Sequence, residues 1–276
     1  MTESVLRGVL PSETNLRDLV TAWLPQGFAK IVQPIASTTI TTDTQGLVAG
    51  EVKIQTMTGP VPAYRAMPEK GGKLPVVLVV QEIFGVHEHI KDVCRRLAKL
   101  GYFAIAVDLY HRQGDVTKFT DNQEIFAKVV NFVPDSQVMS DLDASVVYAE
   151  STGKADTSRL GVTGFCWGGS TVNFLAVTLG TELHAGVPFY GAAAETASVP
   201  KIKAPLLIHY AETDPRVNEM RPAFEAALKA AGVPHQMHIY PGTQHGFHNN
   251  STPRYHEASA KLAWERTIAF FRKNLA

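Results

Sequence analysis

The chain has 276 residues, of which 45% are hydrophobic and 19% charged, so it can bury the core of one large α/β domain or two small ones. Its 26 basic and 26 acidic residues cancel, which argues against nucleic acid or a membrane surface as the partner. Two cysteines make no disulfide framework, and no apolar run of about 18 residues predicts a membrane span.

The N-terminus carries no sign of export. It lacks the basic-then-apolar layout of a secretory signal, and two free cysteines suit a reduced compartment. We therefore expect a cytoplasmic protein. Residues 1–45 are interpreted as an N-terminal extension, with a short helix predicted over residues 16–24, and residues 46–276 as the main domain.

Two alternating runs rich in β-branched residues begin the main domain. LVAGEVKIQTM and VPAYRAM are separated by a turn at Gly59 and Pro60. Alternation with a period of two, interrupted by turn residues, is typical of paired antiparallel strands. We expect a hairpin that leads into the main sheet.

From Leu74 onward, buried strands alternate with helices. The strand candidates are the runs LPVVLVVQ, YFAIAVDLY, LGVTGF, AGVPFYG, APLLIHYA and HQMHIY. Helices are predicted over residues 138–149, 170–179 and 222–231 and over the closing run KLAWERTIAFFRKNL. Continuous apolar strands that alternate with helices predict an α/β fold, with a mostly parallel central sheet and helices on both faces.

Two of the predicted helices carry an apolar stripe with a period of 3.6 residues. One stripe comprises Ile90, Val93, Cys94, Leu97 and Leu100, in the segment that follows LPVVLVVQ. The other comprises Trp264, Ile268, Phe271 and Leu275, in the closing run. Such stripes face a core. Cys94 is therefore expected to be a packing residue rather than a reactive one.

The segment GFCWGG, residues 164–169, follows a predicted strand and opens a helix. A strand, then Gly-x-nucleophile-x-Gly, then a helix is the layout of the nucleophile elbow in α/β-hydrolases. The turn tolerates little bulk, which accounts for the glycines on both sides of Cys166. A small buried cysteine at a strand end is the alternative interpretation.

An acid and a histidine follow Cys166 in the order that this fold uses. Asp214 lies in HYAETDPRV and His245 in YPGTQHGFH, and each follows a predicted strand. The three side chains should meet at the carboxyl edge of the sheet. An imidazole can take the thiol proton, and a carboxylate can fix its tautomer. His248 is the alternative base, and Asp214 has the alternative role of capping the next helix.

An acyl intermediate also needs two donors for its oxyanion. One is the backbone amide of Trp167, which follows the nucleophile. The other should come from the loop after the first parallel strand, QEIFGVHEH, where Ile83 is the candidate. Trp167 is also expected to form part of the pocket wall.

Four separate segments resemble the dienelactone hydrolase (carboxymethylenebutenolidase) family. They are QEIFGVHEHIKDVCRRLAKLGYFAIAVDLYHRQG, GFCWGG, ETDPRV and PGTQHGFHN, within a resemblance from about residue 50 to the C-terminus. The resemblance implies an α/β-hydrolase that opens small lactones or cleaves small esters with a triad of Cys166, His245 and Asp214. We expect no cofactor.

The same resemblance implies roles for two further residues. In the family, the carboxylate that matches Glu82 holds the resting thiol and helps to form the thiolate, and the arginine that matches Arg112 binds a substrate carboxylate. A second family arginine is not matched, because Asn249 stands in its place, and Arg254 lies nearby in the sequence. Glu82 as an ordinary member of its loop, and Arg112 as the anchor of a surface carboxylate, are the alternatives.

Other functions stay open at this stage. A general carboxylesterase or thioesterase would use the same triad, and a ligand-binding protein with this fold would not use it at all. His87, His89 and His111 are expected at the surface or the pocket edge. His87 and His89 with Glu82 and Glu88 could suggest a metal site. This interpretation is disfavoured, because residues two apart do not share a helix face and no cysteine joins them. A homo-oligomer is left open.

Overall fold

The computed structural model describes residues 41–276, so the helix predicted over residues 16–24 lies outside the described residues. Eight strands form one sheet. They are β1 (Leu47–Thr56), β2 (Gly59–Pro68), β3 (Leu74–Val80), β4 (Phe103–Val107), β5 (Ala155–Phe165), β6 (Ala185–Phe189), β7 (Leu206–Thr213) and β8 (His235–Gln244). The division of the chain at residue 45 stays a prediction.

The strand order is β1-β2-β4-β3-β5-β6-β7-β8. Strands β1 and β2 pair antiparallel with Thr56 opposite Gly59, and β2 pairs antiparallel with β4. All further pairs, from β4 and β3 to β7 and β8, are parallel. The predicted hairpin and the mostly parallel sheet are both confirmed, and the carboxyl ends of the parallel strands lie along one edge.

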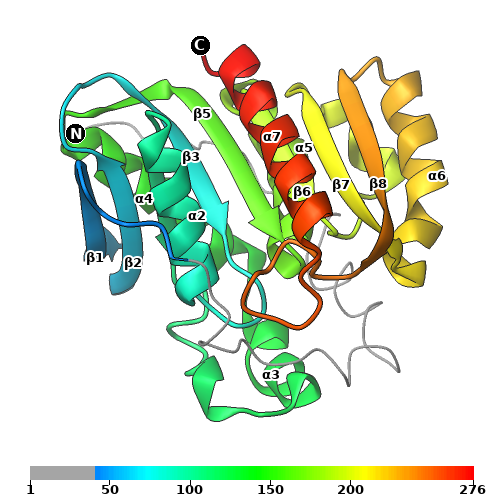
Figure 1. Cartoon of the computed structure of the whole chain (residues 1–276), viewed down its shortest axis with the longest axis horizontal. Coiled ribbons are helices and arrows are strands. Elements are labelled where there is room, and N and C mark those ends of the chain that lie inside the picture. The colour runs from blue at the N-terminus through cyan, green and yellow to red at the C-terminus, as the bar shows by residue number, and fades with distance from the viewer. Residues whose placement is uncertain (1–40) are drawn as a thin grey trace.

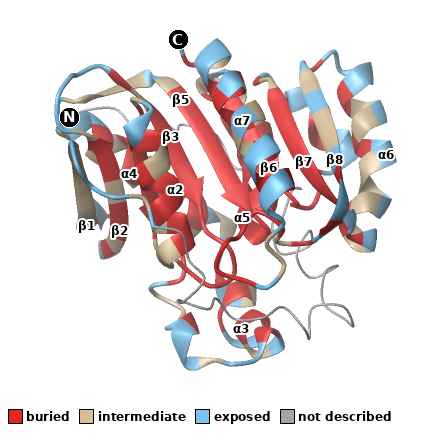
Figure 2. Ribbon diagram, viewed as in Figure 1, coloured by how far each residue is buried: buried red, intermediate tan, exposed pale blue. Residues whose placement is uncertain are grey.

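Helices cover both faces of this sheet (Figure 1). The α-helices are α2 (Glu88–Lys99), α3 (Asn122–Lys128), α4 (Asp135–Ser151), α5 (Trp167–Leu179), α6 (Pro215–Ala230) and α7 (Glu257–Asn274). In Figure 1, α2 and α7 lie in front of the sheet, and α4 and α5 lie behind it. Figure 2 shows that buried residues concentrate on the central strands, which lie between these helix layers, and on α5.

The apolar stripes of α2 and α7 face the core, with one exception. Cys94 and Leu97 of α2 and Phe271 of α7 are fully buried, as the periodicity predicts. Leu100 was wrongly assigned to the buried stripe, because it caps the end of α2 and keeps 38% of its surface exposed.

The first residues of several helices differ from those predicted, because the residues at the start of each helix determine where it begins. Helix α5 begins at Trp167 rather than at residue 170, because the elbow itself starts the helix. Helix α6 begins at Pro215 rather than at residue 222; proline suits the first helical turn because it has no backbone N–H to leave unpaired there. The short helix α3 has no counterpart in the predicted elements. Within residues 41–276, no helix is long and apolar enough to cross a membrane.

Candidate active site

Cys166 lies at the sharp corner between β5 and α5. Its φ of 58° and ψ of −116° are unusual for a residue with a side chain. Two backbone hydrogen bonds fix the corner: its N–H donates to the carbonyl of Phe189 at 3.1 Å, and its carbonyl accepts from the N–H of Ser170 at 3.1 Å. Such strain persists only where the surrounding structure holds it, and it is common at functional sites.

Close backbone packing explains the glycines of GFCWGG. A Cβ atom at Gly164 would lie 2.2 Å from the carbonyl oxygen of Gly168, and one at Gly168 would lie 2.4 Å from that of Val80. The oxygen of Val80 belongs to β3 and that of Gly168 to the first turn of α5, so neither can move without displacing the sheet or the helix. The corner therefore admits a side chain at position 166 but none at these two flanking positions.

His245 and Asp214 meet across the loops that follow β8 and β7. The His245 Nδ1 atom lies 2.6 Å from Asp214 Oδ2, and both side chains are buried. Asp214 occupies the N-cap position of α6, yet its side chain makes no capping hydrogen bond. Its carboxylate is therefore committed to the imidazole rather than to the helix.

The charges around His245 favour the imidazolium. Burial by itself lowers the pKa of His245, but Asp214 and Cys166 outweigh that effect and raise the pKa to about 10. The structure thus places a strongly basic imidazole next to the thiol. An arrangement of this kind stabilises a thiolate.

The alternative base, His248, lies elsewhere. Its ring stacks on Phe165 with centroids 5.1 Å apart and packs against Phe189, within the core. Burial lowers the pKa of His248 well below the usual value. The prediction that His89 lies at the surface or pocket edge is wrong: its side chain is fully buried and contacts His248, because its position on α2 faces the sheet.

Ile83 and Trp167 both lie beside the nucleophile. Ile83 is buried and lines a small hollow, of about 10 Å³, together with Cys166 and His245. Trp167 is the first residue of α5, where backbone N–H groups have no partner within the helix. Its indole packs on Tyr110, with ring centroids 5.1 Å apart.

Glu82 is buried and held by three side chains. The Tyr190 hydroxyl donates to Oε1 at 3.3 Å, the Asn249 amide donates to Oε2, and Nε2 of His87 lies 3.4 Å from Oε2. Burial raises the pKa of Glu82, but His87, His89 and Asn249 lower it overall. Glu82 is thus an ionised carboxylate beside Cys166 in the wall of the hollow.

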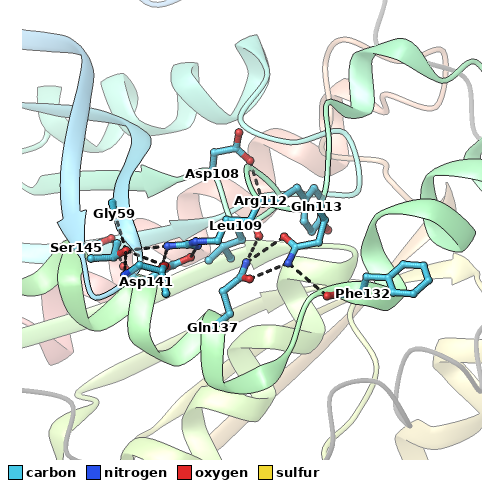
Figure 3. A network of polar contacts seen from close by, with 12 residues as sticks. Gly59, Asp108, Leu109, Arg112, Gln113, Phe132, Gln137, Asp141 and Ser145 are labelled. Carbon is cyan, nitrogen blue, oxygen red and sulfur yellow. Dashed lines mark hydrogen bonds and ion pairs between the residues drawn. The ribbon is translucent and has the colours of Figure 1, made fainter.

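The structure does not bring Arg112 into this site (Figure 3). Its Nη1 and Nη2 atoms lie 2.7 and 3.1 Å from the two carboxylate oxygens of Asp141, and Nη2 also donates to Thr56 Oγ1 at 2.8 Å. Arg112 lines a separate hollow together with Met57. A buried carboxylate needs a cationic partner, and the guanidinium of Arg112 is the partner of Asp141 on α4.

Arg254, which the sequence placed near the site without a role, does reach it. The side chain lines the hollow over Cys166, and its Nη1 donates to the carbonyl of His245 at 3.3 Å. Burial lowers the pKa of Arg254, although Asp214 and Cys166 oppose that effect. The only sequence signal for this residue is an arginine in the loop after His245.

No cluster of three or more metal-binding side chains occurs in the described part of the chain. Of the residues considered for a metal, Glu82 and His87 contact each other, whereas Glu88 binds Arg95.

Comparisons with known proteins show which proteins this chain is similar to. Residues 61–275 match the Dienelactone hydrolase family. A "Putative carboxymethylenebutenolidase" of Methylorubrum extorquens is 49% identical over 96% of this chain and 95% of its own length, and one of Escherichia coli K12 is 41% identical over 90% and 95%. The crystal structure of a "Putative Dienelactone Hydrolase" from Klebsiella pneumoniae superposes with a TM-score of 0.79 at 39% identity, over 82% of this chain and 99% of its own. The family match includes Glu82, Cys166, Asp214, His245 and Arg254.

Proposed function

Because the chain belongs to the dienelactone hydrolase family, a family of carboxylic-ester hydrolases, we propose that it opens small lactones or cleaves small esters with Cys166 as the nucleophile. The observation that carries this proposal is the strained corner at Cys166 beside the His245–Asp214 pair.

The first half of the reaction forms an acyl-enzyme. His245 accepts the thiol proton, Asp214 stabilises the imidazolium, and the Cys166 thiolate attacks the substrate carbonyl. The amides of Ile83 and Trp167 are the donors that we assign to the oxyanion. As the C–O bond breaks, the imidazolium returns its proton to the leaving oxygen, and a thioester remains on Cys166.

The second half releases the acid. A water molecule enters, His245 takes one of its protons, and the hydroxide attacks the thioester carbonyl. The C–S bond breaks, and the proton returns to the thiolate. For an enol-lactone, the leaving oxygen can instead depart as an enolate while His245 keeps its proton. That enolate, in the same molecule, then takes the proton of the water, and the His245 proton returns to the thiolate when the C–S bond breaks.

Glu82 acts, in this proposal, by positioning rather than by carrying the thiol proton. Its contacts with Tyr190, Asn249 and His87 tie down the loop that also bears Ile83. The basic group that faces Cys166 is His245, and we assign the proton transfer that forms the thiolate to this pair, without Glu82 as the acceptor. Ultraviolet absorbance of the wild type, with Cys166→Ala as the blank, measures the thiolate; a signal that appears only with substrate would restore the thiol-holding role of Glu82.

The substrate class follows from Arg254. A guanidinium in the wall of the catalytic hollow favours a substrate with a carboxylate near the reacting carbonyl, as a charge-assisted pair. Asn249, in place of a family arginine, removes one positive charge from that wall. This loss favours the second candidate, a broader carboxylesterase, for which the carboxylate adds little. Arg254→Ala separates the two: a larger effect on acidic than on neutral substrates supports the lactone hydrolase.

The central experiment compares hydrolysis of dienelactones, simple lactones and p-nitrophenyl esters by the wild type and Cys166→Ala. Loss of all turnover in a folded Cys166→Ala protein supports the proposal, whereas substantial turnover would exclude Cys166 as the nucleophile. Cys94→Ala is the matched control, because it removes the other thiol from α2, outside the site. The cytoplasmic location stays part of this proposal, and fractionation of the source cells tests it.

A further inference from the structure

A second and larger cleft opens beside the catalytic hollow. Its volume is about 210 Å³, and it lies between the loop after β3, the strand β2 and the segment after β4. Phe84 lines both cavities, and His87, which contacts Glu82 on the catalytic side, lines the cleft. The cleft and the catalytic hollow therefore lie next to each other and share Phe84 as a wall.

The walls of this cleft are largely apolar. Tyr64 and Phe84 supply two aromatic rings that are almost fully buried, and Val86, Val116 and Pro62 supply aliphatic surface. Aromatic and aliphatic walls with a few polar groups are the usual lining of a small-molecule site. A ring or a short hydrocarbon of the ligand fits this surface.

The charges in the cleft are mostly acidic. Lys91 and Glu51 neutralise each other at 2.7 Å, which leaves Asp108 and Asp115. Among the described residues, each carboxylate accepts its hydrogen bonds through Oδ1. Asp108 Oδ1 accepts from the N–H of Tyr110 at 3.0 Å, and Asp115 Oδ1 accepts from the N–H of Thr117 at 3.0 Å. Each Oδ2 atom can therefore accept a hydrogen bond from a ligand.

We propose that this cleft holds the end of the substrate distant from the reacting carbonyl, and that it selects an apolar or aromatic group that carries an ammonium. This inference rests on the proposed hydrolysis at Cys166. The preferred ester then places its reacting carbonyl in the hollow that Arg254 lines, and its ammonium group in the cleft beside Asp108 and Asp115. An anionic end would meet two carboxylates and be rejected.

Three matched esters test the charge preference. We expect 2-phenylethyl acetate with a para-aminomethyl group to show a kcat/KM about tenfold above the unsubstituted ester, the gain from one charge-assisted hydrogen bond. The para-carboxymethyl ester should be the poorest of the three. Acid release at pH 7 measures all of them, and equal kcat/KM values would overturn the inference.

Two variants place the preference in the cleft. Asp108→Asn combined with Asp115→Asn keeps the side-chain acceptors but removes both charges, so it should abolish the preference while methyl acetate hydrolysis stays unchanged. Thr117→Trp, at an exposed position of the rim, should slow all phenylethyl esters and spare methyl acetate. Retention of the preference in the double variant would place the site elsewhere.

A binding measurement keeps the cleft separate from the chemistry. The alcohol 2-[4-(aminomethyl)phenyl]ethanol should bind Cys166→Ala in calorimetry and lose about tenfold in affinity when Asp108→Asn and Asp115→Asn are added. If the wild type hydrolyses no ester but this binding is seen, the proposed function fails and the cleft stands. If esters are hydrolysed but no such binding occurs, the inference on the cleft fails.

Discussion

Asp214, directly after β7, and Asp141, within α4, are both buried carboxylates, and each is paired with a basic side chain from another part of the chain. Asp214 holds His245 by a single contact of 2.6 Å beside the thiol. Asp141 holds Arg112 through both carboxylate oxygens, in a hollow that does not include Cys166. The resemblance of the sequence to one family implied a functional role for His245 and for Arg112 alike.

The difference lies in what fixes each basic group. His245 has a short side chain whose position follows from its backbone, so the loop order along the sheet edge is enough to place it. Arg112 has a long side chain that can reach several partners, and the nearest buried carboxylate takes it. A motif therefore predicts where a backbone lies better than where the end of a long side chain lies.

The largest expected effect concerns Asp214, the carboxylate beside the proposed nucleophile. Asp214→Asn should lower kcat by about 10³- to 10⁴-fold, because the amide favours the wrong imidazole tautomer while keeping its size. Stopped assays with a p-nitrophenyl ester measure it, and thermal unfolding should change little. A decrease of less than tenfold would mean that Asp214 does not orient the base.

Arg112→Ala tests the structural member. Removal of the cation from buried Asp141 should lower the free energy of unfolding by about 3 kcal/mol, and kcat/KM should fall equally little for acidic and neutral substrates. Arg159→Ala is the matched control, because its pair with Asp156 is more exposed and should contribute about 0–1 kcal/mol. A selective loss of acidic substrates in Arg112→Ala would instead return Arg112 to substrate binding.

A third prediction concerns pH. The pKa of His245 is raised from 6.5 to about 10 in the folded state, so its contribution to stability is full below about pH 6.5 and is lost as the pH rises to about 10. A guanidinium keeps its charge over this whole range. The difference in unfolding free energy between the wild type and His245→Gln should therefore shrink with rising pH. The difference between the wild type and Arg112→Ala should stay constant.

The smallest effect concerns the thiol that the proposed chemistry does not use. Cys94 is fully buried, and burial raises the pKa of its thiol. Cys94→Ala should cost about 1 kcal/mol of stability, as for a small truncation in a core, and leave kcat unchanged. Mass spectrometry after brief iodoacetamide treatment should find the label on Cys166 alone; label on Cys94 in the folded protein would contradict its assignment to the core.

The fold was predictable because each strand and helix carries its own pattern. The apolar run of β3, residues 74–80, is too continuous for a strand with one face in solvent, so it predicts a strand buried on both faces. The hairpin around Gly59 follows from alternating residues interrupted by a turn. Leu100 was misjudged because periodicity does not show where a helix stops. Helix α3 was missed because its seven residues carry too short a stripe to stand out.

The candidate site was predictable in part, for the same reason. Cys166, Asp214 and His245 follow strands, and the structure brings them together. Arg254 carries no local pattern, because its position in the hollow depends on how the loop after His245 folds back over the elbow. The contacts of Glu82 with Asn249 and Tyr190 join residues more than 100 positions apart, and no spacing rule reports such a meeting.

The backbone packing at the elbow also sets rules for protein engineering. Randomisation of Gly164 or Gly168 would yield mostly misfolded clones, because any added Cβ meets a backbone oxygen of the sheet or of the turn. Thr252 and Arg254 line the same hollow from a loop outside the elbow, and their side chains are not enclosed by this backbone. A library directed at new substrates should leave the glycines fixed and concentrate its diversity at these two loop positions.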